Sequence, residues 1–281
     1  MFGRILGVAA LSAGGACAEA HGDLVARGEY LVEGIMGCGN CHAAAGPEGP
    51  KPFDALVGRM VEETPAFTAW APNLTPASRI ADWSDPELAR AIREGIRPDG
   101  SVIGPPMPFS AYRGISDDDL AALVAYLRSL EPVENETPDS TYNIPLPPAY
   151  GPPVERVSAP EAGPTVEYGE YLAKNLAHCM ECHSVMTPTG PDYTPGQGLG
   201  AGGFEFHGPW GTSVAANLTN HPDGLAEYED AEIVQMIVAG EHPGGSPMMP
   251  PMPYAYLTRT DPADPDAVVV YLRQLPPVEG H

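Results

Sequence analysis

Basic residues are scarce in this sequence. Its 281 residues include 14 lysines and arginines against 37 aspartates and glutamates, and only Lys51 and Lys174 are lysines. The formal net charge of -23 argues against nucleic acid as a partner, because binding to phosphates depends on clustered cations. The charge is compatible with solubility alone, or with docking to a partner protein that presents a basic face.

Long hydrophobic runs are also missing. The only candidate follows Arg4, starts at Ile5 and ends near Ala18, which is too short for a comfortable membrane span. A basic residue, a short apolar run and then small residues are typical of a secretory signal. We therefore predict that residues 1–20 are a signal peptide and that the remainder is periplasmic. Cys17 leaves a lipid anchor open, although no leucine stands three residues before it.

Cysteines are few, and with Cys17 set aside every one belongs to a C-x-x-C-H motif. The motifs are Cys38-Gly-Asn-Cys41-His42 and Cys179-Met-Glu-Cys182-His183. Two disulfides are conceivable in an oxidising compartment, but a disulfide needs no histidine after its second cysteine. Zinc sites rarely place the histidine directly beside a cysteine, and a thioredoxin-like motif does not explain a second copy. The pattern is typical of c-type haem attachment, with two thioethers to the porphyrin and the imidazole directed at the iron.

The similarity between the two motifs extends well beyond the cysteines. GEYLVEGIMGCGNCH, which starts at Gly28, aligns without a gap with GEYLAKNLAHCMECH, which starts at Gly169. The NLT triplets starting at Asn73 and Asn217 follow at nearly the same offset, and so do VAYLRSLEPVE, from Val124, and VVYLRQLPPVE, from Val269. The order of segments is the same in both halves, which indicates an internal duplication.

Two proline-flanked methionines are the candidates for the second axial iron ligand. Met107 lies in PPMPF, downstream of His42, and Met252 lies in PPMPY, at a similar separation downstream of His183. A histidine–methionine pair is a common axial set in electron-transfer cytochromes. A single methionine is more often a core residue, but two in matching contexts favour ligation. Met248 and Met249 compete with Met252, yet they align with Ile103 and Gly104, which cannot ligate iron.

These motifs resemble those of di-haem class I cytochromes c, and in particular the cytochrome subunits of periplasmic dehydrogenases. The similar segments include an NLT triplet, the run DWSDPELARAIREG and the M-P-[FY] triplet. The resemblance implies a mainly α fold of two tandem class I cytochrome c domains joined by a proline-rich linker. It also implies two covalently bound haem c groups. The second half departs from the pattern, because Tyr228 replaces Trp83 and a glycine-rich stretch follows His183.

The predicted domains are residues 21–134 and 165–281, each a cytochrome c domain, with residues 135–164 as the linker. Residues 131–164 contain nine prolines and no apolar periodicity, which predicts an extended segment lying across either domain. Ser84 with Glu87, and Ser116 with Asp119, predict helix starts. The resemblance implies that the first and last helices of each domain cross closely, at Gly28 and at Gly169.

The predicted function is a periplasmic relay of single electrons between a dehydrogenase or reductase and a respiratory or photosynthetic acceptor. The protein itself would not be an enzyme. Its partner would be a redox protein, and peripheral association with a membrane complex is left open. The alternative is a di-haem enzyme of the peroxidase-like or sulfur-compound-oxidising type, in which one iron keeps an open position. His178, which aligns with Gly37, is expected at the surface or at the rim of the haem site.

Overall fold

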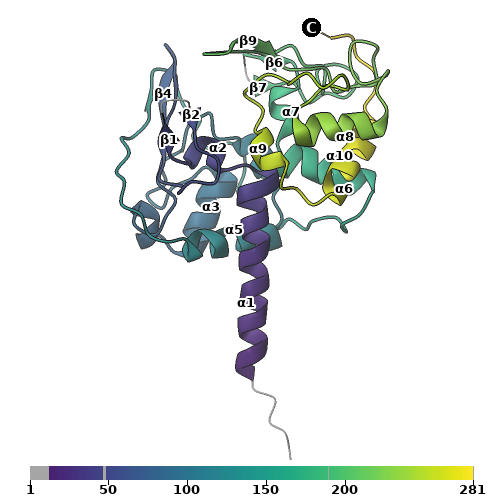
Figure 1. The fold of residues 1–281 in the computed structure, drawn as a ribbon. Helices are drawn as coiled ribbons and strands as arrows, with labels where there is room; N and C mark the ends of the chain where they lie inside the picture. The colour runs from purple at the N-terminus through teal and green to yellow at the C-terminus, as the bar shows by residue number, and fades with distance from the viewer. Residues whose placement is uncertain (1–12, 47–48, 189, 281) are drawn as a thin grey trace, which may run out of the picture.

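The computed structural model describes residues 13–46, 49–188 and 190–280, and most of its elements occur twice in the same order (Figure 1). The elements of the first half are α1 (Ala13–Tyr30), η1 (Leu31–Ile35), α2 (Gly39–His42), β1 (Ala45–Gly46), β2 (Gly49–Pro50), β3 (Arg59–Glu63), β4 (Phe67–Ala71), η2 (Arg79–Asp82), α3 (Asp85–Glu94), α4 (Phe109–Tyr112) and α5 (Asp117–Ser129). After β5 (Thr141–Tyr142), the second half consists of α6 (Val166–Tyr171), η3 (Leu172–Leu176), α7 (Cys179–Cys182), β6 (Met186–Thr187), β7 (Gly190–Pro191), β8 (Glu205–Gly208), β9 (Gly211–Val214), α8 (Asp230–Ala239), α9 (Tyr254–Leu257) and α10 (Ala263–Leu272).

The predicted signal segment is only partly described. Residues 1–12 lie outside the described residues, and residues 13–20 form the first part of α1, which projects from the body of the molecule (Figure 1). No helix of the described residues combines the length and the apolar character that a membrane span requires. The cleavage of residues 1–20 stays a prediction.

The prediction of a mainly α fold is wrong. Helices account for 35% of the structure and strands for 12%, and the strands of the described residues form four small antiparallel sheets. Several strands have only two residues, so no alternating pattern marks them in the sequence. The longer hairpin β3–β4 is closed by Thr64, whose hydroxyl accepts the backbone N–H groups of Ala66 and Phe67. Local turn chemistry of this kind favours strand pairing where helix periodicity is absent.

The predicted helix starts are confirmed. Ser84 and Glu87 form a capping box at the start of α3, and the helix ends at Gly95, which has a left-handed φ of 69°. At the start of α5, the Ser116 hydroxyl accepts the backbone N–H of Asp119 at 3.1 Å. Side chains at both N-termini thus satisfy amide groups that have no partner within the helix.

The first and last helices of each half cross at a glycine, as expected. A Cβ atom on Gly28 would lie 2.1 Å from the carbonyl oxygen of Ala122 and 2.5 Å from Cβ of Tyr126. On Gly169 it would lie 1.9 Å from the carbonyl oxygen of Ala267. At both crossings the backbones of two helices are in direct contact, which leaves no room for any side chain.

The linker lies across the first half rather than between the halves. Its strand β5 pairs with β4, extending the β3–β4 hairpin to three strands. The hydroxyl of Tyr142 donates to the carbonyl of Pro105, and that of Tyr150 donates to the carbonyl of Ile103, both at 2.8 Å. The linker therefore covers the loop that carries Met107.

The two halves contact each other beside their cysteine motifs. The ring of Tyr112, in α4, meets the ring of His178 edge-on at a centroid distance of 5.8 Å. Conversely, Tyr256 of the second half, in α9, lies against α2 of the first half. A Cβ on Gly39 would be 2.2 Å from the hydroxyl oxygen of Tyr256. His178 therefore packs at the interface between the halves, with its side chain still 28% exposed. Its expected place at the rim of the haem site stays a prediction. Each motif is covered by a tyrosine of the other half.

Candidate haem-binding sites

The first attachment segment brings Cys38, Cys41 and His42 together on one turn. The π-helical turn η1 ends the long first helix, and the left-handed Gly37 (φ 55°) redirects the chain into α2. The backbone N–H of His42 then donates to the carbonyl of Cys38 at 3.0 Å. This compact turn places two sulfur atoms and one imidazole at neighbouring positions.

The imidazole of His42 is held in one tautomer. The side chain is only 6% exposed, and its Nδ1 lies 2.8 Å from the carbonyl oxygen of Pro72. Nδ1 therefore carries the proton and donates, which leaves the lone pair on Nε2 for a metal. Burial lowers the pKa of His42 to about 4, so the ring is neutral at physiological pH.

The second attachment segment repeats this geometry. His183 is 9% exposed, and its Nδ1 lies 2.7 Å from the carbonyl oxygen of Ala216. Burial lowers its pKa as well. The turn preceding α7 is again left-handed, although its residue is His178 (φ 43°) instead of a glycine. Both histidines thus present an unprotonated Nε2.

The four cysteines of the motifs are free thiols, so the disulfide alternative is not realised in the structure. Burial raises the pKa of Cys38 to about 12 and that of Cys179 to about 11. The thiols are therefore protonated near neutral pH. Among the described residues, no group of three or more histidine, cysteine, aspartate or glutamate side chains is placed to hold a metal ion.

Backbone hydrogen bonds give the two methionine loops the same register. The N–H of Phe109 donates to the carbonyl of Met107, and the N–H of Tyr254 donates to that of Met252, both at 2.9 Å. Met252 thus occupies the position in its loop that Met107 occupies in the loop of the first half. Met107 is partly buried against the core, whereas Met248 is the methionine of the second loop that packs there. Ligation by Met107 and by Met252 stays a prediction.

The NLT triplets of the two halves make matching hydrogen bonds. The Asn73 side chain donates to the carbonyl of Val133 at 2.8 Å, and its oxygen accepts the N–H of Thr75. Asn217 makes the equivalent bond to Val278 at 2.7 Å. Each triplet therefore fastens the segment that follows the last helix of its half, which explains why the triplet and the PVE segment are repeated together.

An unsatisfied arginine donor distinguishes the first site. The guanidinium of Arg59 donates to the carbonyl of Asn40 at 2.5 Å, between the two cysteines of the motif. Its Nε is buried and has no hydrogen-bond partner among the described residues. A buried cationic donor without a partner is costly, and haem carries two propionate groups that accept such donors. With the free thiols and the unprotonated Nε2 atoms, these residues fit haem c.

Residues 25–131 match the model of the Cytochrome c family. The match to this family indicates a covalently bound haem c in this segment. The match lies in the first half alone, so the expectation of two tandem class I cytochrome c domains is corrected to one matched domain. The second half shares the order of its elements with the first but lies outside this match.

Over most of its length the chain is similar to cytochrome subunits of dehydrogenases, which confirms the resemblance seen in the sequence. It is 29% identical over 276 residues to the fructose dehydrogenase cytochrome subunit of Gluconobacter japonicus, covering 92% of this chain and 54% of the relative. It is 30% identical over 257 residues to the cytochrome c subunit of the quinone alcohol dehydrogenase of Gluconobacter oxydans, covering 84% and 51%. The chain thus spans about half the length of these relatives.

A relative of comparable size is the diheme cytochrome c-type protein of Cereibacter sphaeroides. It is 29% identical over 279 residues, which cover 90% of this chain and 86% of that protein. The similarity therefore includes both cysteine motifs of the present chain. It extends across the second half, which the family match does not reach.

Proposed function

We propose that this chain, which carries a cytochrome c domain at residues 25–131, is a periplasmic di-haem carrier of single electrons. It would pass them between a dehydrogenase or reductase and a respiratory or photosynthetic acceptor. The observation that carries the proposal is the repeated attachment site, in which a buried histidine donates Nδ1–H to a backbone carbonyl and keeps Nε2 free. The named relatives support a dehydrogenase as the donor.

The residues have distinct roles in this proposal. Cys38 and Cys41 would hold one porphyrin by thioether bonds, and Cys179 and Cys182 would hold the other. His42 and Met107 would be the axial ligands of the first iron, and His183 and Met252 those of the second. Bound haem supplies a reversible one-electron couple, and methionine as an axial ligand raises its potential. The carbonyls of Pro72 and Ala216 orient the imidazoles, and burial keeps water away from them.

The number of haems per chain tests the proposal directly. We expect two haems by the pyridine haemochrome assay and by mass. Replacing Cys179 and Cys182 together by alanine should leave one haem, because only the first pair of thiols can still form thioethers. Cys17→Ala is the control and should keep both haems. A wild-type chain with fewer than two covalent haems would reject the proposal.

The methionine ligands are tested by conservative substitution. In the ferric protein, Met107→Leu and Met252→Leu should each abolish the sulfur-to-iron charge-transfer absorption of one haem and lower its midpoint potential, since the thioether is lost but the volume is kept. Met248→Leu is the matched control and should leave both signals intact. Loss of the signal in the Met248 variant instead of the Met252 variant would reassign the ligand.

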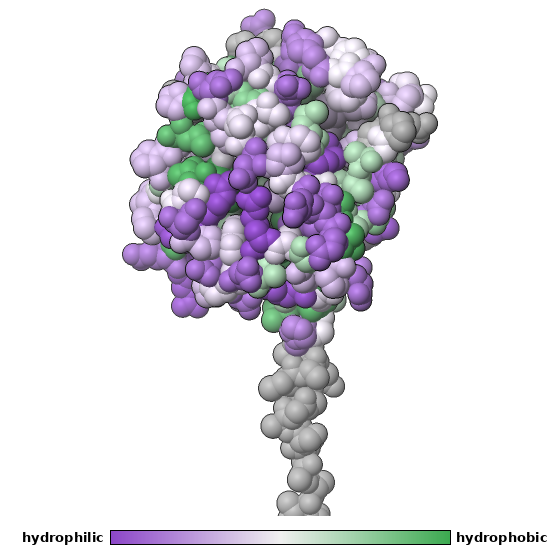
Figure 2. Space-filling view, turned by 90° about the vertical axis from the view of Figure 1, so that its left-hand side faces the viewer, coloured by the Kyte–Doolittle hydropathy of each residue, from purple (hydrophilic) through white to green (hydrophobic). Residues whose placement is uncertain are grey.

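Docking to a basic partner should depend on salt. Hydrophilic residues dominate the face of the first half (Figure 2), and the net charge is -23. We expect the rate of electron transfer with the partner protein to fall about tenfold from low to physiological ionic strength, because salt screens long-range steering. Reduction by an uncharged small reductant is the control and should not change. A partner rate that does not depend on salt would contradict docking by charge.

A further inference from the structure

Two tyrosine–aspartate pairs connect the halves of the molecule. The Tyr30 hydroxyl donates to Oδ2 of Asp264, and the Tyr171 hydroxyl donates to Oδ2 of Asp119 at 2.6 Å. The two tyrosines occupy equivalent positions of the repeated segments, and so do the two aspartates. Both aspartates are buried, Asp264 at 5% and Asp119 at 6% exposure. Each half thus supplies one donor and one acceptor.

Each tyrosine hydroxyl also accepts a backbone amide of the other half. The N–H of Ser116 lies 3.1 Å from the hydroxyl oxygen of Tyr171, and the N–H of Asp261 lies 3.3 Å from that of Tyr30. The hydroxyl therefore bridges an N–H group and a carboxylate at the start of the other half's last helix. Because the donor and the acceptor have fixed positions, these hydrogen bonds select one relative orientation of the two halves more strictly than apolar packing does.

Each aspartate keeps its second oxygen for a partner within its own half. Arg27 donates to Oδ1 of Asp119 at 2.8 Å, and Tyr168 donates to Oδ1 of Asp264 at 3.0 Å. Arg27 and Tyr168 are themselves equivalent positions of the repeat. A buried carboxylate is costly unless it is fully hydrogen-bonded. A shift of one half against the other would remove one of the two side-chain partners from each carboxylate.

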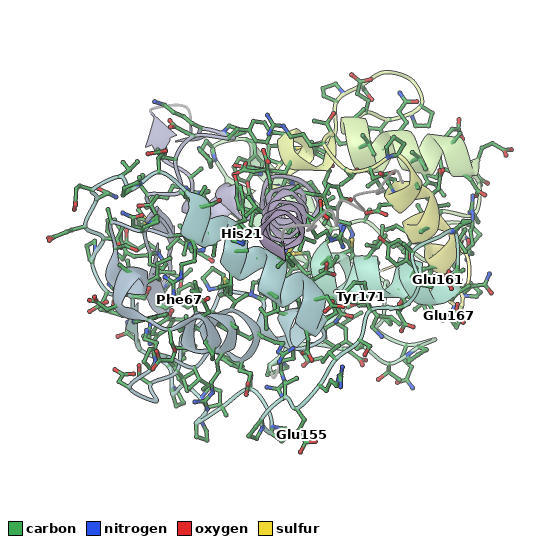
Figure 3. All side chains as sticks on the ribbon, turned by 90° about the horizontal axis from the view of Figure 1, so that it is seen from below. His21, Phe67, Glu155, Glu161, Glu167 and Tyr171 are labelled. Carbon is green, nitrogen blue, oxygen red and sulfur yellow. The ribbon has the colours of Figure 1, made fainter. Side chains whose placement is uncertain are left out.

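The pairs lie at the beginning of the attachment segments. Tyr30 ends α1 and directly precedes η1, and Tyr171 ends α6 and directly precedes η3. Seen from below, Tyr171 lies near the middle of the molecule, between Phe67 in the first half and Glu161 and Glu167 at the outer edge of the second (Figure 3). The same segments lead to the cysteines, and the other half covers them. A short π-helical turn therefore separates each tyrosine from the cysteine motif of its half.

We propose that Tyr30–Asp264 and Tyr171–Asp119 are positioning pairs that set the relative orientation of the two haem sites and thereby the rate of electron exchange between them. The inference rests on the proposed function, since it requires a haem at both motifs. Burial raises the pKa of both tyrosines above that of an exposed phenol. They therefore remain protonated donors throughout the physiological pH range.

The test compares Tyr30→Phe/Tyr171→Phe with Tyr168→Phe in the full-length protein carrying its haem. Tyr168 donates to the same carboxylate as Tyr30 but stays within one half, so it controls for the loss of a buried hydroxyl. In the double variant we expect backbone amides of residues 109–114 and 254–260 to exchange hydrogen about tenfold faster, which corresponds to about 1.4 kcal/mol. Tyr168→Phe should leave these segments unchanged.

Electron exchange between the sites is the second measurement. After flash reduction, equilibration between the two haems should slow about tenfold in the double variant, with the absorption spectra of both haems unchanged, and should keep its wild-type rate in Tyr168→Phe. The inference is overturned if either the amide hydrogen exchange or the electron equilibration of the double variant proceeds at the wild-type rate. It is also overturned if Tyr168→Phe changes these two rates as much as the double variant does. A wild-type haem count below two would reject the proposed function instead, and hydrogen exchange would still show whether the pairs hold the halves.

Discussion

Replacing Gly28 by alanine is expected to lower the free energy of unfolding by about 3 kcal/mol. The added Cβ would lie 2.1 Å from the carbonyl oxygen of Ala122 and 2.5 Å from Cβ of Tyr126. Neither neighbour can rotate away, because one is backbone and the other is attached directly to it. The two helices must separate, and the buried apolar contacts on either side of the crossing are then loosened. Urea unfolding followed by circular dichroism measures the loss.

The same helix provides the control for this prediction. A Cβ on Gly22 would meet nothing within 4 Å, and alanine is a better helix former than glycine by about 1 kcal/mol. Gly22→Ala should therefore be neutral or slightly stabilising. Gly169→Ala should be as harmful as Gly28→Ala, since its Cβ would lie 1.9 Å from the carbonyl oxygen of Ala267. Equal stability of the Gly22 and Gly28 variants would contradict the close crossing.

Arg128→Met is expected to cost about 2 to 3 kcal/mol of unfolding free energy. The Arg128 guanidinium donates to the carbonyls of Ile80 and Trp83, and its Nε lies 3.0 Å from Oδ1 of Asp85. It ties the last turn of α5 to the segment that leads into α3. Methionine keeps the apolar stem but removes the Arg128 donor from the carbonyl of Trp83, and leaves the carbonyl of Ile80 with only the N–H of Trp83. The loss of these two hydrogen bonds contributes more to the expected destabilisation than the loss of the ion pair with Asp85. Arg273 makes the equivalent bonds in the second half.

An exposed ion pair serves as the comparison for the arginine prediction. Arg79 pairs with Asp139 at 2.8 Å, but the two side chains are 41% and 81% exposed. Such pairs contribute little to stability, so Arg79→Met should change the unfolding free energy by about 0.5 kcal/mol or less. Equal losses of unfolding free energy in the Arg79 and Arg128 variants would show that the hydrogen bonds of Arg128 to the carbonyls do not stabilise the fold. Thermal or urea unfolding of both variants decides this.

The sequence indicated those features that depend on neighbouring residues or on the repeat. Ser84 and Glu87 predicted the start of α3 because a capping box needs only four residues. Gly28 and Gly169 were expected at the crossings because the resemblance placed them there. The repeat of the cysteine motif indicated that the two halves are alike at these positions, and a short helix carries the cysteines in both.

What the sequence did not reveal depends on contacts between distant segments. Two-residue strands such as β5 form only because a partner strand is presented to them, and nothing in the linker composition marks them. Asp119 was interpreted only as part of a helix start, which did not indicate its hydrogen bond to Tyr171. A signal was nevertheless present, since both residues recur at equivalent positions of the repeat. The carbonyls that orient His42 and His183 carry no side-chain signature, so they had to be found in the structure.

The exchange of equivalent hydrogen bonds between the halves has a consequence for the origin of the molecule. An interface in which each partner offers the same donor and the same acceptor is isologous, the kind that two identical subunits form around a twofold axis. A single-domain ancestor carrying the tyrosine and the aspartate would have self-associated through this surface. Joining the two copies by residues 135–164 makes that association independent of concentration. After such a fusion, the two copies are free to diverge, as the difference between Arg27 and Tyr168 at equivalent positions illustrates.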